Sequence, residues 1–253
     1  MRVRLLGTGT SQGIPIIGCT CPVCTSTDER DHRLRTSALV EVDGLNILID
    51  AGPDLRQQLL RCGVTRLDAL LMTHEHKDHT GGIDDVRPIN FLMKQPLNIY
   101  GQPRVMKAIR NDYSYAFATE QYPGVPQLVL NPIQPEPFEV KGVEVIPVKV
   151  RHMTLPIFGY RIRNFGYITD ASFISETEKK KLKGVKVLVI NALRRELHYS
   201  HFNLEQALSI IDEIKPERAY LTHVSHRLGK YVEVSAELPE NVFLGIDNQV
   251  IEV

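Results

Sequence analysis

Short runs of aliphatic and β-branched residues recur along the chain, separated by turn signals such as Asp43-Gly44. Runs of this length between glycine, proline or aspartate predict β-strands. Nine strands are expected, at residues 3–6, 37–42, 45–49, 67–72, 143–150, 157–163, 167–169, 185–190 and 218–222. The run at 185–190 is apolar without alternation, which predicts a strand that is buried on both faces.

Helical patterns lie between these runs. One helix is expected after Pro53, and Leu55, Leu59 and Cys62 share its apolar face, so Cys62 is expected to be a core residue. A second is expected to start after Gly82. Ser175 begins a capping box for a short basic helix. A further helix is expected to be capped by Asn203, and its apolar face is formed by Leu204, Ala207, Leu208, Ile211 and Ile214.

Strands dominate both halves of the chain with helices between them, which favours two stacked sheets covered by helices on the outside, an α/β (α+β) sandwich. We expect residues 1–253 to form one domain. Residues 111–137 are rich in Tyr and Pro and are expected to be irregular. The aromatic side chains of 111–126 could line a pocket or form a homodimer contact, but such a cluster more often serves packing, so no role is assigned to it.

Composition narrows the class of protein. The chain is 43% hydrophobic and 24% charged, as soluble globular proteins are. Its 30 basic residues balance 30 acidic ones, which does not favour binding to long nucleic acids. No signal peptide and no apolar run of roughly 18 residues is present, so we expect a cytoplasmic protein without a membrane partner. The four cysteines are then expected to be free thiols or metal ligands.

The densest group of candidate ligands is Thr73-His74-Glu75-His76-Lys77-Asp78-His79, directly after a predicted strand. Imidazole and carboxylate groups are common protein ligands of divalent metals. His74 and His76 are two apart in an extended segment and can point to the same side. Asp78 and His79 can serve a second ion if the chain turns before Gly82. The cluster therefore predicts a site for two ions and a metal-dependent hydrolase.

Three further candidate ligands follow predicted strands. His152 follows 143–150, Asp170 follows 167–169 and His223 follows 218–222. Loops at one edge of a sheet scaffold are where functional sites are usually built. Each of these residues alone could serve an ordinary polar or capping role.

A second candidate site lies near the N-terminus. Cys19, Cys21 and Cys24 place three thiols within six residues, a spacing that suits zinc better than a local disulfide. His226, three residues after His223, is the expected fourth ligand. The loop at 18–25 is therefore expected to hold one structural zinc ion.

The motif Thr-His-x-His-x-Asp-His, with a later His, an Asp after Tyr-Ile-Thr and a final Thr-His, resembles the metallo-β-lactamase superfamily along nearly the whole chain. The resemblance implies an αββα sandwich with a dinuclear site. It places His74, His76 and His152 on one ion, and Asp78, His79 and His223 on the other. Asp170 would bridge the two ions, which are expected to be zinc or manganese.

The cysteine loop together with His223-x-x-His226 resembles the PhnP-like phosphodiesterases, and the same loop also occurs in the PqqB-like branch. The PhnP resemblance implies hydrolysis of small cyclic phosphodiesters, such as phosphoribosyl 1,2-cyclic phosphate or 2′,3′-cyclic nucleotides, by a metal-activated hydroxide. It also implies that His201 is the general acid, with Asp78 assisting. His198 and His32 receive no role.

Two other functions stay open at this point. One is a tRNA 3′-processing endonuclease, which would need a basic arm to hold tRNA, and no long basic Gly-rich insertion is present. The other is a PqqB-like protein of cofactor biosynthesis. That branch tends to lose part of the hydrolase ligand set, whereas this chain retains all of it.

Overall fold

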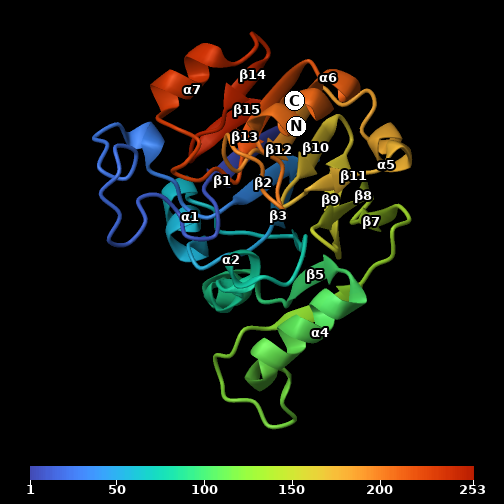
Figure 1. Cartoon of the computed structure of the whole chain (residues 1–253). Helices are drawn as coiled ribbons and strands as arrows, with labels where there is room; N and C mark the ends of the chain where they lie inside the picture. Colours follow the sequence, from blue (N-terminus) through green and yellow to red (C-terminus); the bar gives the residue numbers. More distant parts are fainter.

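Two β-sheets stacked face to face form the centre of the molecule, seen in a computed structural model that describes residues 1–253. The first sheet has seven strands in the order β15 (Gln249–Glu252), β1 (Arg2–Gly7), β2 (Ser37–Val42), β3 (Leu45–Ile49), β4 (Ala69–Leu71), β5 (Leu97–Gly101) and β6 (Leu128–Pro132). Strands β15 to β3 are antiparallel neighbours, whereas β3 to β6 run parallel. The two termini meet on this sheet, where β1 pairs with β15 (Figure 1).

The second sheet contains the chain from residue 138 to 244. Its order is β11 (Phe173–Ile174), β8 (Val143–His152), β9 (Leu155–Ile162), β10 (Phe165–Ile168), β12 (Val187–Asn191), β13 (Arg218–Thr222) and β14 (Val242–Leu244), and β7 (Phe138–Val140) pairs with β8. Strands β10, β12, β13 and β14 are parallel. The carboxyl ends of β10, β12 and β13 therefore lie at one edge of the sheet.

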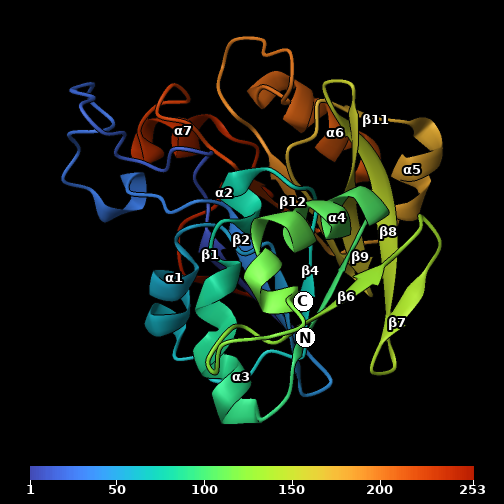
Figure 2. The ribbon, with the colours of Figure 1, turned by 90° about the horizontal axis from the view of Figure 1, so that it is seen from below.

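Helices cover the outer face of each sheet. The first sheet is covered by α1 (Leu55–Cys62), α3 (Arg87–Met93) and α4 (Pro103–Asp112), and the second by α5 (Glu176–Lys181), α6 (Leu204–Ile214) and α7 (Tyr231–Glu237). Figure 2 shows α1 and α3 on one side of the strands and α5 on the other. The short α2 (Lys77–Thr80) and the 3₁₀ helices η1 (Glu29–Asp31), η2 (Ile83–Val86) and η3 (Ser114–Phe117) complete the set.

The four layers enclose three spaces between them, and each space is filled by an apolar core. Twenty-three buried residues lie between the sheets, among them Ile47 on β3 and Tyr160 on β9. A second cluster of 23 fills the space under α6 and α7, and a third of 19 lies under α1, α3 and α4. The αββα sandwich expected from the sequence is confirmed. No helix is both long and apolar enough to cross a bilayer.

Most expected elements are present, and several bounds shift by one or two residues. Asn203 caps α6 through a capping box with Gln206, and the Ser175 side chain accepts the N–H of Glu178 at the start of α5. The expectation of an irregular stretch at 111–137 is wrong in part, because η3 and β6 lie within it. β6 is a half-exposed edge strand that pairs only with β5, so its burial signal is weak.

Candidate metal centres

The ends of five strands meet at one edge of the sandwich and bring ligand-type side chains together there. The residues at or directly beyond these ends, or within the following loop, are Asp50, His74, His152, Asp170 and His223. Asp50, Asp170 and His223 have φ values of 60, 49 and 53°. Asp and His are enriched among the few non-glycine residues that adopt this left-handed conformation, which costs about 1–3 kcal/mol. The chain thus turns sharply at three of the strand ends.

The loop after β4 supplies the other candidate ligands. His74 and His76 lie in its extended part, and Nε2 of His74 is 3.0 Å from Nδ1 of His76. The chain then enters α2, which places Asp78 and His79 on its first turn. The turn expected before Gly82 is therefore a short helix. Tyr113, in the aromatic segment left unassigned from the sequence, donates its hydroxyl to the carbonyl of Thr80 at 2.7 Å and supports α2.

All seven residues expected at the dinuclear site lie together in two groups. One group is His74, His76 and His152, and the other is Asp78, His79, Asp170 and His223, with the candidate ligand atoms of each group within 4.8 Å of one another. Asp170 connects the two groups. Its Oδ2 lies 3.2 Å from Nε2 of His79 and 3.7 Å from Nε2 of His74.

The chemistry of this donor set fits divalent cations. Nδ1 of His223 is buried without a hydrogen-bond partner and lies 2.9 Å from Oδ1 of Asp170. Burial lowers the pKa of His74, which favours the neutral imidazole that binds metal. Nitrogen lone pairs and carboxylate oxygens that converge in a buried space are costly unless a cation lies between them. The site residues therefore suit the divalent ions that the sequence predicts.

A surrounding set of hydrogen bonds orients the histidines. Asp50 holds Nδ1 of His79 at 2.7 Å and also accepts the N–H and hydroxyl of Thr73 at 2.9 and 2.8 Å. The carbonyl of Ser200 lies 2.8 Å from Nδ1 of His152. Contacts of this kind fix the tautomer and leave the other ring nitrogen for a metal.

Asp50 was not among the residues predicted from the sequence, although a usable signal was present. It directly follows the predicted strand 45–49, as the predicted ligands follow theirs. The backbone explains why the loop after Asp50 must lie so near α2. A Cβ on Gly52 would lie 2.1 Å from the carbonyl oxygen of Asp78. The chain therefore needs glycine at position 52 to bring Asp50 and α2 together.

Charges within the site are balanced by one another. Burial by itself would lower the pKa of His79, but Asp170, Asp78 and Asp50 outweigh it and raise that pKa well above its usual range. Burial would likewise raise the pKa of Asp170, but His223 and His79 hold it well below the ordinary value. The Asp170 carboxylate is therefore ionised at neutral pH.

His201 lies against the centre, outside the two groups that together hold the seven expected ligands, but it forms a third possible ligand group with His152 and Asp170. Its Nε2 is 3.4 Å from Oδ2 of Asp170, and its ring stacks on His223 with centroids 5.0 Å apart. Nδ1 faces away, 2.9 Å from the hydroxyl of Ser200. Burial lowers the pKa of His201 to about 4, so the ring is neutral near pH 7. His32 is exposed and contacts none of these residues. Its Nε2 lies 3.0 Å from the carbonyl of Ser26.

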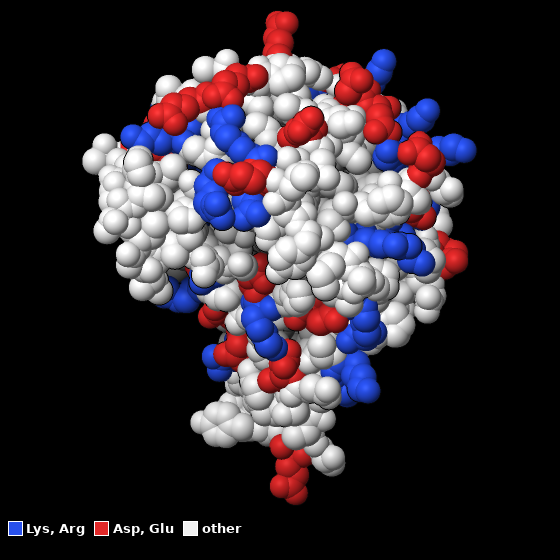
Figure 3. Space-filling view, in the orientation of Figure 1, with Lys and Arg blue, Asp and Glu red and all other residues white.

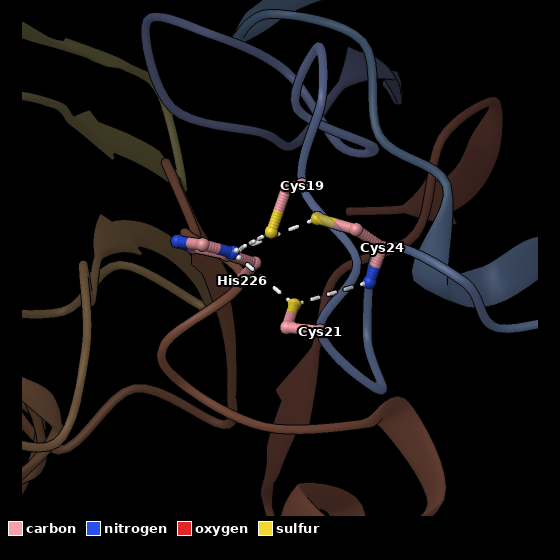
Figure 4. Close-up of side chains that lie close together, drawn as sticks. All are labelled: Cys19, Cys21, Cys24 and His226. Carbon is pink, nitrogen blue, oxygen red and sulfur yellow. Dashed lines mark hydrogen bonds between the residues drawn. The ribbon is translucent and has the colours of Figure 1, made fainter.

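The second cluster lies in the N-terminal loop (Figure 4). The sulfur atoms of Cys19, Cys21 and Cys24 lie 3.3, 3.3 and 3.5 Å from Nδ1 of His226, and no disulfide joins them. Zinc bonds of about 2.3 Å to sulfur and about 2.0 Å to nitrogen imply tetrahedral edges of about 3.5 Å. The four side chains therefore fit a closed zinc site. Cys62 lies apart on α1 and is partly packed against the core, as expected.

Backbone pairing explains how His226 reaches the cysteines. The segment after β1 lies beside the segment after β13, because Thr10 donates its N–H to Val224 and Val224 donates to Thr8, at 3.0 and 2.9 Å. The hydroxyl of Thr10 also lies 3.2 Å from Nε2 of His223. One segment, 222–226, thus contributes to both clusters.

Comparisons with known proteins agree with this arrangement. A profile of the Beta-lactamase superfamily domain matches residues 45–224. An Octanoyltransferase of Porphyromonas gingivalis is 43% identical over 98% of this chain and 50% of its own length. Coenzyme PQQ synthesis protein B of Methylobacterium radiotolerans is 32% identical over 43% of this chain and 40% of its own length. The chain spans about half or less of these relatives.

Solved structures share the whole fold. A new diphosphatase from the PhnP family superposes with a TM-score of 0.93 and 36% identity, covering 100% of this chain and 97% of that one. Zinc-bound PqqB from Methylobacterium extorquens gives 0.80 at 19% identity, with both chains fully covered. Human tRNase Z, short form, gives 0.73 at 20% identity over 100% and 99% of the two chains. The last two show a common fold alone.

Proposed function

Because the chain belongs to the metallo-β-lactamase superfamily and to its PhnP family, we propose that this metal-dependent hydrolase acts on small cyclic phosphodiesters. The expected substrates are of the phosphoribosyl 1,2-cyclic phosphate or 2′,3′-cyclic nucleotide type. The observation that carries the proposal is the position of Asp170, which touches both groups of ligand-type residues and also His201. A phosphoryl group at this point would meet the candidate ligands and a ring N–H together.

The ligand assignment follows the two groups. We assign His74, His76 and His152 to one ion, and Asp78, His79 and His223 to the other, with Asp170 shared. Imidazole and carboxylate donors suit zinc or manganese. When bound, such ions polarise a phosphoryl oxygen and lower the pKa of a water molecule. Cys19, Cys21, Cys24 and His226 would hold a separate structural zinc ion that ties the N-terminal loop to the segment carrying His223.

His201 is the proposed proton donor to the leaving oxygen; its ring is neutral in the free protein, so the negative charge of a bound phosphodiester has to raise its pKa from about 4 before it can donate. Its Nε2 faces Asp170 and its Nδ1 contacts the hydroxyl of Ser200, so the ring is held with one edge toward the centre. Asp78, at the start of α2, is proposed to assist by orienting the attacking water. Positioned donors of this kind contribute roughly 10²- to 10⁴-fold to a rate.

A second candidate reaction is hydrolysis of a diphosphate linkage. The PhnP-family relative at 36% identity is described as a diphosphatase, which favours this reaction. Both reactions displace an oxygen from phosphorus and would use the same donors. They differ in the leaving group, because a phosphate leaves more readily than a sugar alkoxide and depends less on His201.

Other functions receive less support. Basic and acidic side chains alternate over the face shown in Figure 3, so no single-sign patch for tRNA is visible there. The PqqB-like relative is similar over 43% of this chain. One relative is named an octanoyltransferase, but this chain spans only half of that relative. The His and Asp groups at the centre contain no cysteine that could carry an acyl group as a thioester. The half of that relative that this chain does not match can account for the octanoyl transfer in its name.

A substrate panel on one preparation tests the proposal. Metal content would be measured beside hydrolysis of a 2′,3′-cyclic nucleotide, a nucleoside diphosphate, bis-p-nitrophenyl phosphate and precursor tRNA. The proposal predicts the highest kcat/KM for the cyclic nucleotide, and an Asp170→Asn variant as the inactive control. Preference for the diphosphate would favour the second candidate, and cleavage of precursor tRNA alone would contradict both.

A further inference from the structure

The connection between β12 and α6 forms a braced projection beside the centre. Its base is closed by backbone hydrogen bonds, from Leu193 N–H to the carbonyl of Phe202 and from Leu204 N–H to the carbonyl of Arg194, both 2.9 Å. The side chain of Arg194 also donates to the carbonyl of Leu197 at 2.7 Å. In Figure 2 this connection stands out at the top of the view. Its tip therefore has a defined shape.

A row of neighbouring aromatic rings leads from the buried centre to this tip. The ring of His79 stacks on that of His223 at 5.7 Å, and His223 stacks on His201 at 5.0 Å. His201 then lies 5.2 Å from His198, and His198 stacks on Tyr199 at 4.5 Å with an interplanar angle of 27°. Every distance lies within the usual range for interacting rings. The row ends at the surface, where Tyr199 is 75% exposed.

The ring of His198, between His201 and Tyr199, is held in place by Ser200. Nδ1 of His198 receives the backbone N–H of Ser200 at 3.4 Å and lies 3.1 Å from its hydroxyl. The same hydroxyl contacts Nδ1 of His201. Ser200 therefore fixes His198 relative to His201, and the stack on His198 fixes the plane of Tyr199. A single exposed aromatic residue is ordinary, but one aligned with a catalytic centre by fixed contacts is not.

The charges around the tip are already paired. Arg194 lies 3.6 Å from Glu196, and Arg195 forms an ion pair with Glu237 at 2.7 Å. The remaining exposed surface of the tip is the ring of Tyr199 and the side chain of Leu197, which is 69% exposed. This surface suits an uncharged flat group better than a second phosphate.

We propose that Tyr199, backed by His198, is a stacking platform for the planar ring of the substrate, a nucleobase, while its phosphate lies at the Asp170 centre. This inference rests on the proposed function and makes Tyr199 a specificity-determining residue. The platform lies two ring-to-ring steps from His201, of 5.2 and 4.5 Å. Stacking of a base on an aromatic side chain contributes affinity for any base, since every base has a flat face.

A matched pair of substrates separates the platform from the reacting centre. The metal-loaded enzyme would be assayed with adenosine 2′,3′-cyclic phosphate and with ribose 2,3-cyclic phosphate, which lacks the base. Tyr199→Ala is expected to lower the preference for the nucleotide about 10-fold, through KM. Tyr199→Phe should retain the preference, and so should Leu197→Ala, which removes an exposed side chain without a ring. An unchanged preference in Tyr199→Ala, or an equal loss of kcat on both substrates, would overturn the platform.

A binding measurement keeps this inference testable apart from the proposed function. The chain has no tryptophan, so the fluorescence of 1,N⁶-ethenoadenosine monophosphate can be followed on the protein without interference. We expect stacking to quench this probe and Tyr199→Ala to weaken its binding about 10-fold. If neither cyclic phosphate is hydrolysed, the proposed function fails while this titration still decides the platform. Equal binding to wild type and Tyr199→Ala would contradict it.

Discussion

Oδ2 of Asp50 lies 2.7 Å from Nδ1 of His79, on the side of the ring opposite Asp170. The imidazole is thus held between two carboxylates, one behind it and one at the centre. Because the Nδ1–H of His79 donates its hydrogen bond to Asp50, Nε2 is left to face Asp170 and a metal ion. The orientation of the site therefore depends on a residue that is outside the candidate ligand set.

Asp50→Ala should weaken active-site metal binding or activity about 10- to 100-fold, as expected when a carboxylate behind a histidine ligand is lost. Metal affinity would be measured by competition with a chelator, and activity with bis-p-nitrophenyl phosphate. Asp68→Ala is the matched control, because Asp68 is equally buried but bonds to Arg66, Lys141 and Asn46. A loss of metal affinity in the control of the same size would refute a specific role for Asp50.

Cys21→Ser should remove one zinc ion per chain and lower the Tm, while the ions at the Asp170 centre remain. The reason is that the thiol of Cys21 contacts only members of the N-terminal cluster, namely His226 and Cys24. Elemental analysis and thermal melting would be compared with Cys62→Ser, whose thiol lies apart on α1. Retention of all zinc by Cys21→Ser would show that the cluster is not a zinc site.

Asp68 should stabilise the folded protein in a pH-dependent way. Burial acts to raise its pKa, but Arg66, Lys141 and the N–H of Asn46 outweigh burial and hold the pKa below the ordinary value of 3.8. The ionised form is therefore favoured in the folded state, so its stabilisation is fully present above that value and is lost as pH falls through the lower folded pKa.

Asp68→Asn should accordingly reduce the free energy of unfolding by about 1–3 kcal/mol near pH 7, and the difference from wild type should shrink below pH 3.8. Urea titrations across pH would measure it. Asp43→Asn breaks an exposed pair with Arg163 and should cost less than about 1 kcal/mol. A difference between wild type and Asp68→Asn that grows on acidification would contradict the lowered pKa of Asp68.

His201→Ala should slow hydrolysis of a phosphodiester with an alkoxide leaving group by roughly 10²- to 10⁴-fold, and that of a nitrophenolate ester much less. Nitrophenolate needs little protonation to leave. Both metal ions should be retained, since the variant leaves all seven assigned ligands of the two groups in place. His32→Ala, in an exposed position, should retain both rates. Equal losses on the two substrates would remove the role as proton donor.

Sequence patterns predicted the layers of the fold because buried strands and capped helices have strong local signals, as for 185–190 and Asn203. They also pointed to the seven residues that lie together in the two groups around Asp170, because these residues lie at or just past strand ends or, at 73–79, in a dense motif. Edge strand β6 was missed because half-exposed residues carry little periodicity. Asp50 and the Tyr199 platform were missed because their roles depend on contacts that only the folded chain creates.

The central claim is that hydrolysis depends on divalent ions held around Asp170. Metal-free protein would be reconstituted stepwise with zinc or manganese, with hydrolysis of bis-p-nitrophenyl phosphate and bound metal measured at each step, beside Asp170→Ala. We predict that activity is absent without metal and rises in parallel with two ions per chain beyond the one in the cysteine loop, and that Asp170→Ala regains none. Full hydrolysis by the metal-free protein, or by Asp170→Ala, would contradict the account.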